Sequence, residues 1–165
     1  MQVRIVFTAS PSWFGRMIRR VTSSTVSHVF LEFDVWGRRM VMESTIGGTR
    51  IVPAERSRHD IVCEYKLKED GKQPIIDMMG YLGTEYDYTG VLLIAWIRIA
   101  WSWFGLLVSK PTWRSKALKC SELAFLFMQK LDSWTDYLQN NKEAVTPEHV
   151  KGFCDVRRDL FEKVE

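Results

Sequence analysis

The alternation of apolar and polar residues over the first 67 positions is the feature that most constrains the fold of this chain. In residues 27–34 the odd-numbered apolar side chains fall on one face of an extended strand. Trp36-Gly37-Arg38 and Gly47-Gly48 are turn signals. Strands are predicted over residues 3–8, 27–34, 39–44, 49–52 and 60–67. The pattern predicts an antiparallel sheet in which residues 60–67 form the fourth strand of a meander.

Helical signals flank the predicted strands. A Ser-Pro start opens a helix over residues 12–21, and a strongly apolar helix begins at Cys120. Thr146-Pro147-Glu148 combines an N-cap, a first-turn proline and a first-turn acid, which predicts a last helix that runs to the C-terminus. Residues 73–82 are a further predicted helix. The fold class is therefore α+β: a small antiparallel sheet, a meander or partial barrel, packed with helices in one domain over residues 1–165.

Composition excludes several classes of protein. Lysine and arginine number 23 and aspartate and glutamate 20, so the net charge is 23 − 20 = +3. No long basic run is interleaved with aromatics, which argues against a nucleic-acid partner. Three cysteines in a chain of this length do not make a disulfide framework, so free thiols in a reducing compartment are expected. The N-terminus lacks signal-peptide features, which favours a cytoplasmic location and leaves delivery to a cell envelope or virion open.

Residues 91–108 are the most hydrophobic part of the chain. All of them except Arg98, Ser102 and Gly105 are apolar, and an arginine in mid-span is costly in a bilayer. The polar residues also fall at helical spacing, on one narrow stripe. A hydrophobic helical insert is therefore predicted, which docks on the core, a membrane surface or another protein instead of spanning a membrane.

Cys120 is the candidate nucleophile. It begins an apolar helix, where unpaired backbone N–H groups and the positive end of the helix dipole lower the pKa of a thiol. His28, on the polar side of its predicted strand, is the candidate base. The alternative interpretation of Cys120 is a buried thiol in the core, which is common for free cysteine. Cys63 and Cys154 fall on apolar faces and are predicted to pack in the core.

Glu43 is the candidate group that orients the imidazole of His28. Two registers of the predicted hairpin are open: one places Glu43 directly opposite His28, and the other places it diagonally on the same face. Glu32 and Asp34 share that face, so either can be the orienting carboxylate instead. Glu43 can also be a surface charge paired with Arg39 or Arg50. No metal or cofactor is expected, because the sequence lacks the ligand spacings of a zinc site.

Five segments in order along the chain carry a resemblance to a known family. They are Gly15–Thr22 followed by Val26-Ser27-His28-Val29, then Met42-Glu43-Ser44 with Gly47–Ile51, Gly83-Thr84-Glu85-Tyr86-Asp87, Lys119-Cys120-Ser121-Glu122-Leu123 and Thr146-Pro147. This set resembles the circularly permuted NlpC-type, papain-like cysteine hydrolases, the group of YiiX-like proteins and lecithin retinol acyltransferase relatives. The insert at residues 91–108 departs from the pattern.

The resemblance implies a permuted papain-like fold and a Cys/His/polar triad of Cys120, His28 and Glu43, with Tyr86 near the oxyanion site. It implies cleavage of an amide bond in a peptide or a cell-wall peptide. Chemistry on an acyl chain or lipid, by an acyltransferase or esterase, is the alternative on the same fold. A module of another class, without catalysis, would use the Trp-rich segment 91–108 to dock on a partner.

Overall fold

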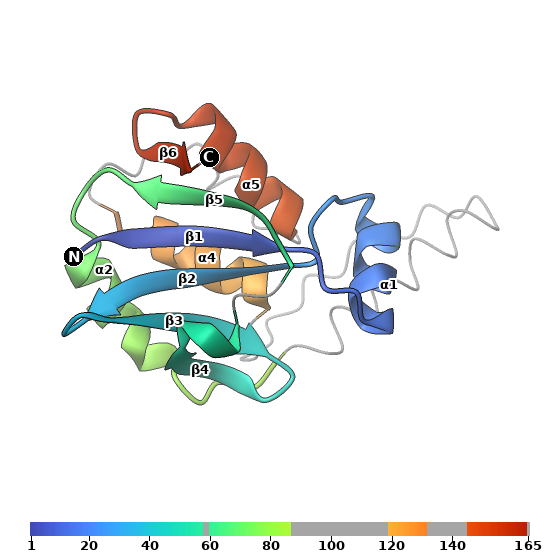
Figure 1. Ribbon diagram of the computed structural model, residues 1–165, viewed down its shortest axis with the longest axis horizontal. Helices are drawn as coiled ribbons and strands as arrows, with labels where there is room; N and C mark the ends of the chain where they lie inside the picture. Colours follow the sequence, from blue (N-terminus) through green and yellow to red (C-terminus); the bar gives the residue numbers. More distant parts are fainter. Residues whose placement is uncertain (58–59, 87–118, 132–144, 165) are drawn as a thin grey trace.

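The computed structural model describes residues 1–57, 60–86, 119–131 and 145–164. Its described strands form one six-stranded antiparallel sheet in the order β4-β3-β2-β1-β5-β6 (Figure 1). The strands are β1 (Val3–Thr8), β2 (His28–Val35), β3 (Arg38–Thr45), β4 (Gly48–Pro53), β5 (Ile61–Leu67) and β6 (Phe161–Val164). The helices are α1 (Trp13–Thr22), α2 (Lys72–Met78), α4 (Cys120–Met128) and α5 (Pro147–Val156), with short 3₁₀ turns η1 (Ala54–Arg56) and η2 (Met79–Tyr81). The predicted α+β class is therefore confirmed.

Strand β5 is not the fourth strand of a meander, so that prediction was wrong. Strands β1 to β4 are neighbours in sequence order, and β5 pairs with β1 instead of β4. The connection crosses the sheet through η1, where Ala54 packs against Val6, Phe30 and Val41. Burying this small apolar cluster and giving β1 a second partner strand favour the crossing over a fourth meander strand.

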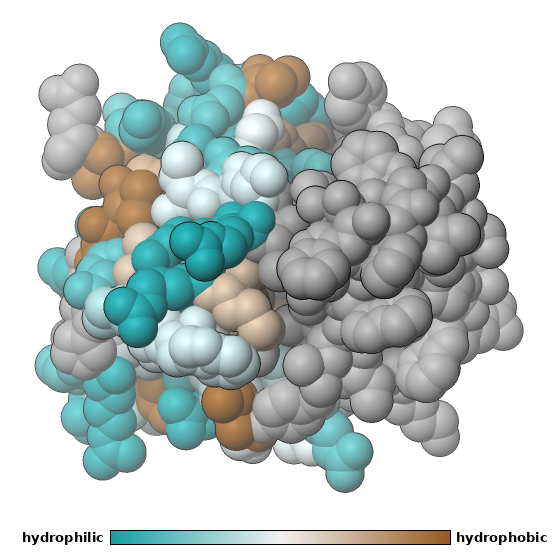
Figure 2. Space-filling model, turned by 90° about the vertical axis from the view of Figure 1, so that its right-hand side faces the viewer, coloured by the Kyte–Doolittle hydropathy of each residue, from teal (hydrophilic) through white to brown (hydrophobic). Residues whose placement is uncertain are grey.

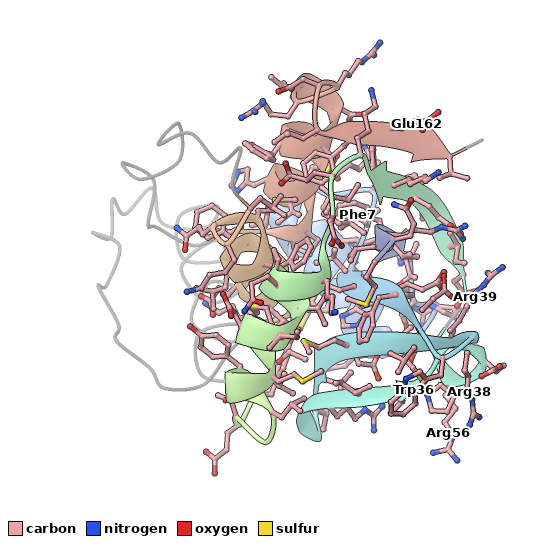
Figure 3. All side chains as sticks on the ribbon, turned by 90° about the vertical axis from the view of Figure 1, so that its left-hand side faces the viewer. Phe7, Trp36, Arg38, Arg39, Arg56 and Glu162 are labelled. Carbon is pink, nitrogen blue, oxygen red and sulfur yellow. The ribbon has the colours of Figure 1, made fainter. Side chains whose placement is uncertain are left out.

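The β2–β3 hairpin adopts the second of the two predicted registers. Val35 pairs with Arg38, and the two turn residues, Trp36 (φ 50°) and Gly37 (φ 78°), both have positive φ, as a type I′ turn requires. Figure 3 shows Trp36 and Arg38 at this turn, on the side away from the helices. Because Leu31 pairs with Met42, Glu43 lies diagonal to His28 and not directly opposite it.

The main core lies between one face of the sheet and the helices. In Figure 1, α4 lies behind the central strands, α2 lies at the lower left of the sheet, and α1 lies beyond one end of the sheet. The core takes alternate residues from each strand, as the period of two requires, together with the apolar side of α4. Its fully buried members include Ile5, Phe7, Val29, Leu31, Met42, Tyr65, Leu123 and Phe127. Cys63 and Cys154 are buried in this core as predicted.

The last helix does not run to the C-terminus, which corrects the sequence-based expectation. Helix α5 ends at Val156, and Arg157 leaves the helical region with ψ 58°. Phe161 then pairs with Leu67, so β6 covers the edge of β5. Phe161 is fully buried and packs edge-on against Phe153, and this burial explains why the chain turns back instead of extending the helix.

No helix in the described ranges is long and apolar enough to cross a membrane. The predicted hydrophobic insert at residues 91–108 lies outside the described residues.

At the end of the molecule that carries α1, hydrophilic residues gather in the centre of the described surface (Figure 2).

Candidate active site

The candidate site forms where the start of β2 meets the start of α4, which packs against that strand. Cys120 is the first residue of α4 and His28 the first residue of β2. The thiol is free and the residue is only 5% exposed. Two residues that are 92 positions apart in the sequence are thus neighbours in space, and each influences the titration of the other.

The environment of Cys120 favours its thiolate. Burial opposes ionisation, but the positive charge and hydrogen bond of His28, with the backbone N–H groups of Val29 and Ser121, hold the pKa of the thiol below its ordinary range. The sulfur also sits in the first turn of α4, where the helix dipole favours a negative charge. The turn itself is ordered by Glu122, whose carboxylate accepts the Lys119 N–H at 3.0 Å.

The imidazole of His28 is held as a cation by two anions. Burial alone would lower its pKa, but the Cys120 thiolate and the Glu43 carboxylate outweigh this and raise the pKa to about 10. Nε2 lies 3.6 Å from Oε2 of Glu43 and has no hydrogen bond to a described residue. Since Nε2 faces the carboxylate, Nδ1 is the nitrogen left to exchange a proton with the sulfur.

Glu43 is shared between His28 and Arg50. Arg50 is directly opposite Glu43 on β4 and donates from Nε (3.0 Å) and Nη2 (2.8 Å) to Oε1, while Oε2 faces His28. Burial would raise the pKa of Glu43, but the interactions with His28 and Arg50 lower it, so the carboxylate is charged at neutral pH. The sequence posed an orienting role and a pair with Arg50 as alternatives, and the structure has both contacts at once.

The other candidate carboxylates on this side of the sheet are engaged elsewhere. Glu32 lies 3.4 Å from Arg4 and 3.8 Å from Arg39, further along β2, and Asp34 is exposed. The sequence analysis considered Arg50 as a surface partner of Glu43 and not as a residue of the site. Its position one tight turn after Glu43 could have predicted the contact, since an antiparallel hairpin centred on Ile46 and Gly47 sets positions 43 and 50 opposite each other.

A cavity of about 290 Å³ opens beside the imidazole. His28, Glu43, Arg50 and Tyr86 line it, whereas Cys120 is not part of its wall. Most of the remaining wall carries hydroxyl groups, from Thr8, Ser10, Ser12, Ser27, Ser44, Thr45 and Ser57. The cavity is therefore suited to a polar ligand that offers several hydrogen-bonding groups.

Tyr86 reaches the cavity because the segment before it is attached to β4. The N–H of Thr49 donates to the carbonyl of Thr84 (2.9 Å), and the N–H of Gly83 donates to the carbonyl of Thr49 (2.8 Å). Tyr86 is buried and shares the cavity wall with His28 and Glu43. Its role as an oxyanion donor stays a prediction, and Asp87 lies outside the described residues.

Gly48→Ala is expected to destabilise the protein and loosen the Tyr86 segment. Gly48 has φ +91°, and an added Cβ would lie 2.9 Å from the carbonyl oxygen of Thr84. Such a strained residue costs about 1–3 kcal/mol. Urea unfolding measures the change, and Gly47→Ala is the matched control because a Cβ there meets nothing within 4 Å. Equal stability of the two variants would contradict this account of the turn.

Among residues 1–57, 60–86, 119–131 and 145–164, no group of three or more His, Cys, Asp or Glu side chains is arranged to hold a metal ion. The site is therefore built from a thiol, an imidazole and a carboxylate, without a described set of metal ligands.

Comparison with known proteins supports the fold. No family model matches the chain, and no curated protein matches it in sequence. Among solved structures it is similar to YiiX, a metalloprotein of Escherichia coli O157:H7, with a TM-score of 0.54 and 15% identity. The match covers 100% of this chain and 96% of YiiX. At this level of identity the likeness concerns the fold alone, and the chain has a YiiX-like fold.

Proposed function

We propose that the chain is a cysteine hydrolase that cleaves amide bonds, with Cys120 as nucleophile, His28 as general base and acid, and Glu43 as the orienting group. The observation that carries the proposal is a buried thiol at a helix start whose pKa is lowered by an adjacent imidazole, itself placed against a buried carboxylate. A perturbed thiol, a base and an orienting group are the parts that nucleophilic catalysis by cysteine needs.

The reaction proceeds in two steps. The sulfur of Cys120 attacks the carbonyl carbon, and His28 gives its proton to the leaving nitrogen as the C–N bond breaks, which leaves a thioester. Water then attacks the thioester while His28 takes a proton from it, and the C–S bond breaks to release a carboxylic acid and to restore the Cys120 thiolate beside the protonated His28. Glu43 keeps Nε2 protonated throughout and so keeps Nδ1 available for the sulfur.

The cavity favours a polar substrate over a lipid chain. Its hydroxyl groups and the half-exposed guanidinium of Arg50 can hydrogen bond to peptide carbonyls and N–H groups, which an acyl chain does not offer. Ile18 and Ile46 add apolar side chains to the wall. Hydrolysis of peptide amides, cell-wall peptides included, is therefore preferred over transfer or hydrolysis of an acyl ester.

The test combines thiol reactivity with hydrolysis. Iodoacetamide is expected to alkylate Cys120 rapidly near pH 6.5, where an ordinary thiol with a pKa of about 8.5 is mostly protonated. Purified protein is expected to clear peptidoglycan in a zymogram or cleave its stem peptides. Cys120→Ala is expected to remove this activity, and Cys63→Ala, a change in the core away from the site, is expected to keep it.

Two outcomes would contradict the proposal. An alkylation profile of Cys120 with its midpoint in the ordinary thiol range would show that the thiol is not activated. Cleavage of an acyl ester but of no peptide would replace the amide substrate with the acyl alternative.

A further inference from the structure

The segment that leads into α5 contacts both elements that carry the candidate site. The hydroxyl of Ser121, the residue after Cys120, donates to the carbonyl of Val145 at 2.5 Å. Three residues later, Oε2 of Glu148 accepts from the N–H of Thr25 (3.0 Å) and from its hydroxyl (3.1 Å). Thr25 lies three residues before His28. Residues 145–148, which we call the α5 bracket, therefore link the nucleophile helix to the start of the histidine strand.

Local structure makes the α5 bracket rigid. Thr146 is the N-cap of α5 and accepts the N–H of His149 at 3.3 Å, while Pro147 has a fixed φ in the first turn. The carboxylate of Glu148 suits the positive end of the helix dipole. Burial would raise its pKa, but the hydrogen bonds from Ser24 and Thr25 lower it, so the charge that accepts them is present at neutral pH.

The contacting residues differ in exposure, and Thr25 is exposed. Ser121 is almost fully buried and Ser24 is nearly so. The hydroxyl of Ser24 lies 2.8 Å from Oε2 of Glu148 and 2.7 Å from the carbonyl of Val26, so its single proton is shared between them. The N–H of Thr25 is the donor with no such competition, and it ties the main chain before β2 directly to α5.

The sheet alone does not set the distance between the sulfur and the imidazole. The N–H of Ser27 donates to the carbonyl of Thr8, which fixes β2 against β1 but not against α4. The attraction between two unit charges falls with their separation. At an effective dielectric constant of about 20, an increase from about 3.5 to 5 Å lowers the ratio of thiolate to thiol about tenfold. Small movements of α4 relative to β2 therefore have a large effect on the amount of thiolate.

We infer that the α5 bracket positions the two reacting groups, with Glu148 and Ser121 as positioning residues that hold the Cys120 sulfur against the His28 imidazole. The inference rests on the proposed function, because it assigns these residues a role in the same site. It gives the Thr-Pro helix start a function beyond capping α5.

The experiment measures the pH dependence of Cys120 alkylation by iodoacetamide, located by mass spectrometry, together with thermal unfolding. Glu148→Ala is expected to slow alkylation at pH 7 about tenfold and to move the profile to higher pH. Glu148→Gln is expected to restore most of the rate, since its amide oxygen still accepts from Thr25. Lys151→Ala is the matched control: Lys151 contacts Oε1 of Glu148 (3.3 Å) and none of the Oε2 donors, so the profile is expected to stay unchanged.

Ser121→Ala tests the other contact and is expected to shift the profile in the same direction. If Glu148→Ala does not fold, the Ser121→Ala variant tests the inference by itself. The inference is overturned if folded Glu148→Ala or Ser121→Ala proteins keep the profile of the unmodified protein, or if Glu148→Gln gives no rescue. An unmodified protein whose Cys120 titrates as an ordinary thiol would instead overturn the proposed function, so the two failures are distinguishable.

Discussion

A His28→Gln variant is expected to lose hydrolytic activity by about 10²–10⁴-fold, the usual contribution of a positioned general acid–base. Glutamine retains much of the volume of the imidazole but carries no positive charge and accepts no proton at neutral pH. The Cys120 thiol then keeps the opposing effect of burial without its strongest stabilising partner, so its pKa rises. Alkylation of Cys120 near pH 6.5 is expected to slow as well, and hydrolysis and alkylation are measured on the same preparation.

His149→Gln is the matched control for the loss of an imidazole. His149 is exposed in the first turn of α5, where Nδ1 of its ring accepts the N–H of Thr146 as a capping contact. We expect this control to retain both activity and the alkylation profile. If His28→Gln hydrolysed substrate at the original rate, His28 would have no role as the base, whatever its distance from the sulfur.

Glu43→Gln is expected to reduce hydrolysis about 10³-fold while the protein stays folded. The amide oxygen can still accept from Arg50, which turns the amide NH₂ toward Nε2 of His28. The ring is then driven to the tautomer with its proton on Nδ1, which cannot take the thiol proton, and a wrong tautomer of this kind is costly in triad enzymes. Loss of the carboxylate also lowers the pKa of His28 from about 10, because it removes one of the two anions that stabilise the cation.

The same variant has a defined signature in stability. The pKa of Glu43 is lowered in the folded protein, so its charge stabilises the fold above the ordinary pKa of 4.5, and this contribution is lost as the pH falls through the folded value. Urea unfolding is expected to show the unmodified protein more stable than Glu43→Gln at pH 6–7, with the difference shrinking below about pH 4.5. A difference that is constant with pH would show that the Glu43 charge contributes nothing to the fold.

Local rules account for the elements that could be predicted from the sequence. The alternation in residues 27–34 and the turn signals at Gly37 and Gly48 specify hairpins, because side-chain period and positive φ are properties of neighbouring residues. Ser12 and Thr146 cap helices for the same reason, since capping bonds span three residues. The candidate residues Cys120, His28 and Glu43 followed from this local placement and from the family resemblance.

Two expectations failed where distant segments compete for the same surface. The residue pattern of 61–67 fits a strand beside β4 as well as one beside β1. The burial of Ala54 over the sheet and the open edge of β1 favour the position beside β1. Likewise, nothing within α5 predicts that it ends at Val156. Phe161 leaves the helical path because the edge of β5 and the ring of Phe153 offer it a buried position.

The sequence by itself determined the strands, the turns, the helix starts and the chemical groups of the site, because each depends on residues that are close together in the sequence. The tertiary structure decided which groups meet: the Cys120 sulfur against His28, the Glu43 carboxylate divided between His28 and Arg50, and Glu148 joined to Thr25. Those contacts depend on strand register and on how α4 and α5 pack against the sheet. Packing is set by burial of side chains from the whole chain together, so no local pattern contains it.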